Sequence, residues 1–119
     1  MTNEQSPQAL DWSAAIELAG GSETLANDLL RMLLEEAPQL LERLDGQLAS
    51  EDPRQLWDDA HKLHGSTAYC GVPALRSASA ALERAIKADD LSAVRASLED
   101  VRRALRSLQA AVEGRGRSD

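Results

Sequence analysis

Aromatic residues and cysteine are both scarce in this chain of 119 residues. Aromatics make up 3% of the sequence and phenylalanine is absent, so a core has to be built from Leu, Ala, Ile and Val. Leu and Ala are among the strongest helix formers. The single cysteine, Cys70, excludes an internal disulfide and is compatible with a reducing compartment. The length is that of one ordinary domain.

Long apolar runs are also missing. No stretch approaches the roughly 18 consecutive apolar residues of a membrane helix, and "MTNEQSPQAL" has neither the basic nor the apolar region of a signal peptide. We therefore expect a cytoplasmic protein, or the cytoplasmic end of a membrane-bound one, without direct membrane contact. The net charge of −7 opposes binding to a phosphate backbone, so no nucleic-acid partner is expected.

The apolar residues recur with a period near 3.6 and predict five helices. Asp11 is the expected cap of a short first helix that "GG" at 20–21 ends, and Ser22 is the expected cap of a long second helix. Pro38 predicts a kink or a break near Ala37 in that second helix. The remaining helices are predicted from a cap at Asp52 and Pro53 to about Cys70, from Pro73 to the "ADD" at 88–90, and from a cap at Asp90 or Ser92 onward.

The predicted fold is all-α, an antiparallel up-down four-helix bundle with a short extra N-terminal helix laid across one end. Residues 1–9 are expected to be a disordered lead-in, residues 10–113 the bundle domain, and residues 114–119 a disordered tail. The buried stripe of the third helix is predicted at Leu56, Ala60, Leu63 and Thr67.

The third helix carries both histidines of the chain, in "DDAHKLHGST" at 58–67. If Ala60 and Leu63 face the core, a rotation of 100° per residue presents His61 to solvent. Gly65 lies one turn further on, where glycine is less stable than alanine by about 1 kcal/mol. Its missing side chain either clears a path to the imidazole for another molecule or permits tight helix packing.

The neighbours of His61 on this face have two interpretations each. Trp57 is either a partly buried packing residue or an anchor for a partner, and Asp58 lies beside it. Lys62 is either a solvated charge or a counter-charge for an anion carried on His61.

"AHKLHGSTAYCGVPAL" at 60–75 resembles the signature of histidine-containing phosphotransfer (HPt) domains, with the form H-x-L-K-G-S followed by G-A and an apolar position. His61, Leu63, Gly65, Ser66, Gly71 and Leu75 fall on matching positions. The opening "LDWSAAIELAGGSETLANDLL" is similar to the family's usual start, so the resemblance covers about residues 10–112. The "LHG" variant is similar to that of the terminal domains of hybrid sensor kinases of the BarA/GacS type.

The resemblance implies a four-helix bundle whose histidine accepts a phosphoryl group from the aspartyl-phosphate of one receiver domain and passes it to the aspartate of another. It makes His61 the phosphoacceptor. We expect Lys62, His64 and Gly65 to form the environment of the phosphohistidine, and Trp57, Asp58 and Ala68 to take part in partner recognition. His64 stands where the family usually has lysine. Histidine is largely neutral at physiological pH, so Lys62 is expected to supply the charge.

The implied partners are receiver domains of a hybrid kinase and of a response regulator, and the isolated domain is expected to be a monomer. No cofactor is expected on this chain, because the receiver brings the Mg²⁺. The chain has no glycine-rich nucleotide loop, so a phosphocarrier without kinase activity of its own is expected.

Two other interpretations remain open at this stage. His61 and His64, with Asp58 one turn back, are spaced to approach one metal ion from a single helix, although structural zinc takes four ligands and Cys70 is more than two turns away. The chain could also be a helical adaptor or dimerisation module whose histidines are never phosphorylated.

Overall fold

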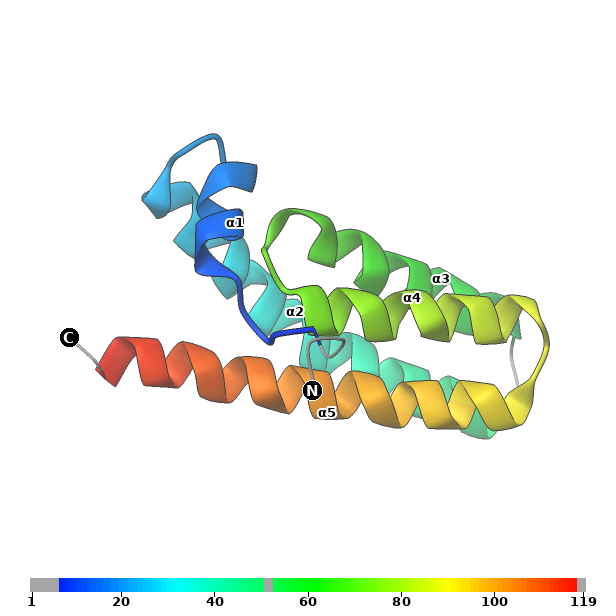
Figure 1. The fold of residues 1–119 in the computed structure, drawn as a ribbon. Coiled ribbons are helices and arrows are strands. Elements are labelled where there is room, and N and C mark those ends of the chain that lie inside the picture. The colour runs from blue at the N-terminus through cyan, green and yellow to red at the C-terminus, as the bar shows by residue number, and fades with distance from the viewer. Residues whose placement is uncertain (1–6, 51–52, 118–119) are drawn as a thin grey trace, which may run out of the picture.

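The computed structural model of the protein describes residues 7–50 and 53–117. Within them it contains helices and no strand. The elements are α1 (Trp12–Leu18), α2 (Glu23–Ser50), α3 (Pro53–Ser66), a 3₁₀ turn η2 (Thr67–Tyr69), α4 (Pro73–Lys87) and α5 (Leu91–Arg117). Short connections join α3 to α4 and α4 to α5, so consecutive helices run antiparallel and side by side, while α1 lies across one end (Figure 1). The predicted all-α class is confirmed.

Side-chain caps start three of the helices as predicted. Asp11 Oδ1 accepts a hydrogen bond from the Ala14 amide at 3.1 Å, and Ser22 Oγ accepts one from the Leu25 amide at 3.0 Å. Of the two caps considered for α5, Asp90 is the one used, since its Oδ1 accepts from the Ala93 amide at 3.1 Å. The predicted cap at Asp52 lies outside the described residues, and α3 begins at Pro53.

Leucine and alanine dominate the core, as the lack of aromatics requires. The predicted stripe of α3 is buried in full. It meets buried side chains of the other bundle helices, among them Leu30, Leu33, Leu40, Leu44, Leu75, Leu82, Leu98, Val101 and Leu108. Burial on this scale stabilises the fold by roughly 25 cal/mol for each Å² of apolar surface removed from water.

Gly71 seats α1 on the bundle. Its φ is +65°, and a Cβ built there would lie 2.6 Å from the carbonyl oxygen of Asp11 and 2.8 Å from the amide nitrogen of Ala15. The Asp11 amide also donates to the Gly71 carbonyl at 2.8 Å. Only glycine combines this conformation with this close approach.

Pro38 does not break α2. The helix is continuous from Glu23 to Ser50, so the predicted break near Ala37 is wrong. Ala37, Leu40 and Leu41 on either side of the proline are buried in the core, whereas the proline itself is exposed. Packing of this buried face outweighs the one backbone hydrogen bond that proline removes.

Two predicted ends also differ from the structure. The α-helical part of α3 ends at Ser66 and tightens into η2, four residues before the expected end at Cys70. Residues 114–117, predicted to be part of a disordered tail, continue α5 to Arg117. The rest of the expected lead-in and tail, residues 1–6 and 118–119, lies outside the described residues. Within the expected lead-in, the carbonyl of Gln8 accepts a hydrogen bond from the Ala74 amide of α4 at 3.0 Å.

Candidate functional site: an exposed histidine against a carboxylate

His61 projects from α3 on the side away from the core. Its side chain is 67% exposed, while Ala60 and Leu63 beside it are completely buried. The predicted orientation of this histidine is confirmed. An exposed imidazole is accessible to a group carried by another molecule.

Glu83 of α4 lies between the two histidines of α3. Its Oε2 is 2.6 Å from His61 Nδ1, and its Oε1 is 3.0 Å from His64 Nδ1. A carboxylate can only accept, so Nδ1 carries the proton in the hydrogen-bonded ring of His61. In the neutral ring of His61 the lone pair is therefore on Nε2, the nitrogen that does not face Glu83.

Trp57 covers one face of the His61 ring. The ring centroids are 5.4 Å apart and the planes are inclined by 17°, which is an offset stack. Lys87 of α4 places Nζ over the indole at 5.4 Å from its centroid. Trp57 is half-buried and thus acts as a wall of the site as well as part of the surface.

Lys62 and Ser66 border the site on the side of α2. Lys62 Nζ lies 4.0 Å from Glu36 Oε2, and Ser66 Oγ donates to Glu36 Oε1 at 2.8 Å. Ser66 Oγ also lies 2.9 Å from the Lys62 carbonyl one turn back. Lys62 therefore contributes a positive charge on the flank opposite to Glu83.

Gly65 is open on its outer side. A Cβ built on it would meet no atom within 4 Å, so helix packing in this molecule does not require glycine here. Of the two interpretations of Gly65, the structure favours the cleared path to His61.

Beyond Gly65 the surface becomes more apolar. Met32 of α2 and Tyr69 of η2 are among the exposed large hydrophobic side chains. They border a hollow whose lining is Leu29, Met32, Leu33, Glu36, Ser66, Tyr69 and Cys70. Burial raises the pKa of the Cys70 thiol to about 11, which keeps this cysteine in its unreactive protonated form.

Asp58 and Ala68, the other two residues predicted for partner recognition, lie on different parts of the surface. Asp58 is exposed on α3, one turn before His61. Ala68 is half-buried in η2 and lines a hollow shared with α1 and the start of α4, next to Leu18 and Arg76. The structure therefore groups Lys62, His64, Gly65 and Trp57 around His61 and places Ala68 farther along, toward α1.

Sequence reasoning missed Glu83 and Glu36, the two carboxylates that flank the site. Glu83 is 22 residues from His61 in the sequence, and Glu36 is 30 residues from Ser66. No local spacing indicates such a contact, because it depends on the register between neighbouring helices.

In the part of the chain that the structure describes, no three His, Cys, Asp or Glu side chains are arranged to hold a metal ion. Nor does any helix there combine the length and the apolar content that crossing a membrane requires.

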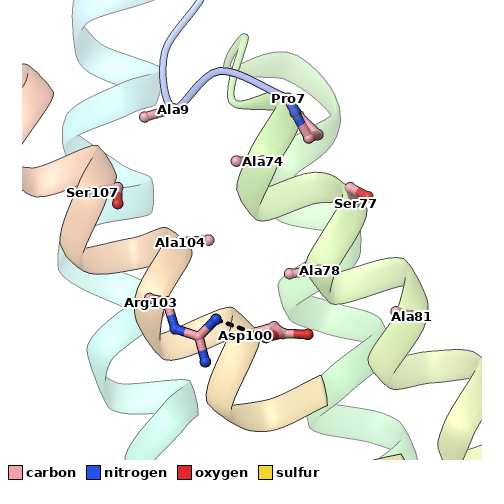
Figure 2. A pocket seen from close by; sticks show the side chains of 10 residues that line it. All are labelled: Pro7, Ala9, Ala74, Ser77, Ala78, Ala81, Asp100, Arg103, Ala104 and Ser107. Atoms are coloured by element: carbon pink, nitrogen blue, oxygen red, sulfur yellow. Dashed lines mark ion pairs between the residues drawn. The ribbon is translucent and has the colours of Figure 1, made fainter. Parts of the chain in front are cut away.

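A separate groove of about 810 Å³ runs between α4 and α5 and ends at the segment before α1. Figure 2 shows its small side chains and one ion pair, between Arg103 and Asp100 at 3.3 Å. The lining is Pro7, Ala9, Ala74, Ser77, Ala78, Ala81, Asp100, Arg103, Ala104 and Ser107. It contains none of the residues of the His61 site.

The fold and the site together define a helical bundle that presents a histidine on its surface. Residues 28–111 match the model of the Hpt domain family. The chain belongs to this family.

Known proteins agree with this assignment. The chain is 41% identical to the signal transduction histidine-protein kinase BarA of Shigella flexneri over 78 residues, 66% of this chain and 8% of that protein. It is 38% identical to the sensor histidine kinase GacS of Pseudomonas protegens over 103 residues, 87% of this chain and 11% of that protein. The matched segment is thus about a tenth of the length of these relatives.

A solved structure agrees as well. The crystal structure of the HPt domain from an Hpt sensor hybrid histidine kinase of Shewanella superposes with a TM-score of 0.78 at 27% identity, covering 88% of this chain and 91% of that one. The predicted resemblance to HPt domains is confirmed.

Proposed function

We propose that this domain is a phosphorelay intermediate in which His61 accepts a phosphoryl group from the aspartyl-phosphate of one receiver domain and passes it to the aspartate of a response regulator. The observation that carries the proposal is the exposed His61 ring, whose Nδ1 is bonded to Glu83 at 2.6 Å. This contact directs the lone pair to Nε2.

The transfer has a simple balance. Nε2 attacks phosphorus in line, the Nε2–P bond forms, and the bond between phosphorus and the receiver's aspartate oxygen breaks. The aspartate leaves as a carboxylate, and the proton stays on Nδ1, so the ring becomes positively charged beside Glu83. Catalysis of this kind relies on positioning and charge neutralisation. Transfer to the next receiver is the same reaction in reverse.

The charge around the phosphoryl group comes from both molecules. Lys62 is the nearby cation of this chain, and His64, which stands where the family usually has lysine, lies with Nδ1 3.0 Å from Glu83 Oε1. The Mg²⁺ is expected on the receiver, and no cofactor or kinase activity is assigned to this domain.

Receivers are proposed to dock over Gly65. A side chain there would stand in open space and obstruct the approach to His61. Trp57, Asp58 and Ala68 are assigned to this recognition surface, and the exposed Met32 and Tyr69 extend it beyond Gly65. Ser66 and Glu36, which border the His61 site, also line the hollow beside Met32 and Tyr69, so the two surfaces are continuous.

The similarity to BarA and GacS supports a place in a hybrid sensor kinase pathway, either as a domain of such a kinase or as a separate carrier. The assignment includes a cytoplasmic location, no nucleic-acid partner and a monomeric state for the isolated domain.

The experiment that tests the proposal uses a radiolabelled phospho-receiver with wild type, His61→Gln and His64→Gln. We expect acid-labile, alkali-stable label on wild type and on His64→Gln, and none on His61→Gln, with all three proteins equally helical by circular dichroism. Absence of label on the wild type with each of several receivers would favour a helical adaptor whose histidines are not phosphorylated.

A further inference from the structure

Trp57 contacts both His61 of its own helix and Lys87 of α4. It lies one turn before His61 on α3, and the two rings stack at 5.4 Å with an interplanar angle of 17°. Lys87 of α4 lies over the indole, also at 5.4 Å, which fixes the orientation of the tryptophan from a second helix. The indole thus touches the reacting ring before any partner arrives.

The charge of the His61 ring changes during the proposed reaction. With the proton retained on Nδ1 by Glu83, formation of the Nε2–P bond leaves a positive charge on the imidazole. The face of an indole attracts a cation within about 6 Å of its centroid, and tryptophan is the strongest of the aromatic residues in this respect. The stack is therefore more favourable with the phosphorylated ring than with the neutral ring.

We propose that Trp57 is a positioning residue that holds the His61 ring by its face and stabilises the positive charge that the ring acquires on phosphorylation. Glu83 acts on the same charge from the Nδ1 edge of the ring, so the two contacts are complementary. The inference rests on the proposed function, because it concerns the phosphorylated state of His61. It assigns Trp57 a role that persists in the absence of any receiver.

The test is phosphorylation without a receiver, using potassium phosphoramidate as the donor. The donor reacts as its zwitterion, H₃N⁺–PO₃²⁻: His61 Nε2 attacks the phosphorus, the P–N bond breaks, neutral ammonia leaves with its own three protons, and the His61 proton remains on Nδ1. Label on His61 is located by mass spectrometry and its rate of formation is measured for wild type, Trp57→Phe and Trp57→Leu. Trp12→Leu is the matched control, because Trp12 also has a cation over its ring, Arg115 at 3.9 Å, and belongs to another part of the molecule.

We expect Trp57→Leu to slow the labelling about two- to fivefold, the factor that corresponds to an exposed cation–π contact. Trp57→Phe should recover most of the rate, and Trp12→Leu should match the wild type, each variant being checked for helicity and cooperative unfolding. In a Trp12→Phe background the fluorescence of Trp57 should change when His61 is labelled. Equal rates for Trp57→Leu and wild type would overturn the inference.

Transfer from a phospho-receiver, compared with the phosphoramidate rate, distinguishes a positioning role of Trp57 from a role in docking alone. If Trp57 only bound the partner, Trp57→Leu would raise the KM for the phospho-receiver and leave the phosphoramidate rate unchanged, which contradicts the inference. If phosphoramidate labels His61 but no receiver does, the proposed phosphorelay is wrong. The role of Trp57 is then decided by the rates of labelling with phosphoramidate alone.

Discussion

Asp59 and Glu83 each join two helices of the bundle, in contrasting surroundings. Asp59 of α3 is 2% exposed and accepts hydrogen bonds from Arg43 at 2.6 Å and Gln47 at 2.8 Å, both on α2. Glu83 of α4 is 14% exposed and faces two histidines of α3. The partner of Asp59 is a permanent cation, whereas the partners of Glu83 can gain or lose a proton.

The difference separates a structural contact from a chemical one. The hydrogen bond from Arg43 is the main reason that the pKa of Asp59 lies below its usual range, with burial acting in the opposite direction. This pair locks α2 to α3, and its half-exposed member, Arg43, is a permanent cation rather than a nucleophile. Glu83 places the same functional group at the edge of the bundle, where it directs an exposed imidazole.

Removal of the carboxylate from Glu83 should have the largest effect on transfer. Glu83→Gln should slow phosphoryl acceptance by His61 roughly 10- to 100-fold, by analogy with the loss of a carboxylate that orients a metal-binding histidine. The reason is that a neutral amide neither offsets the positive ring nor favours a proton on Nδ1 as strongly. Initial rates from a phospho-receiver measure it, and an unchanged rate would show that Glu83 does not direct His61.

Removal of the carboxylate from Asp59 should instead affect stability. Asp59→Ala should lower the free energy of unfolding by about 1–3 kcal/mol, because Gln47 and the guanidinium of Arg43 lose their shared acceptor. Urea denaturation measures the change. Transfer by the folded fraction should remain close to wild type, and a large loss of transfer would contradict the separation between the two carboxylates.

The pH dependence of stability should follow Asp59. Because its pKa is lower in the folded than in the unfolded state, its contribution is complete above the unfolded value near 3.8 and is lost as the pH falls through the folded value. Wild type should therefore lose stability as the pH falls below about 3.8, and the difference in the free energy of unfolding between wild type and Asp59→Asn should narrow over the same range. A gap that stays constant down to about pH 2 would contradict this assignment.

Gly65 and Gly46, two exposed glycines within helices, allow a matched test of whether receivers dock next to His61. A Cβ added to Gly65, or to Gly46 of α2, would meet nothing within 4 Å, so alanine at either site should stabilise the fold by up to about 1 kcal/mol. Gly65→Gln should nevertheless slow transfer, while Gly46→Gln should not. Equal transfer rates for these two glutamine variants would exclude docking over Gly65.

The helices and the exposed histidine were predictable because their signals are local. Caps at Asp11 and Ser22, and the stripe through Leu63, follow from spacing along one helix. Glu83 was not predictable, because its contact with His61 spans 22 residues and depends on how α4 lies against α3. The break predicted as one alternative at Pro38 is absent for a related reason, since the packing that keeps α2 continuous comes from other helices.

The seat of α1 on Gly71 has a consequence for the order of folding. The contact needs the turn between α3 and α4 to be in place, because the Asp11 amide bonds to a carbonyl of that turn. A helix of seven residues is too short to persist alone in water. We therefore expect α1 to dock after the bundle has formed and to open before it unfolds. Exchange of the Asp11 amide proton would then report this partial opening at a lower free energy than global unfolding.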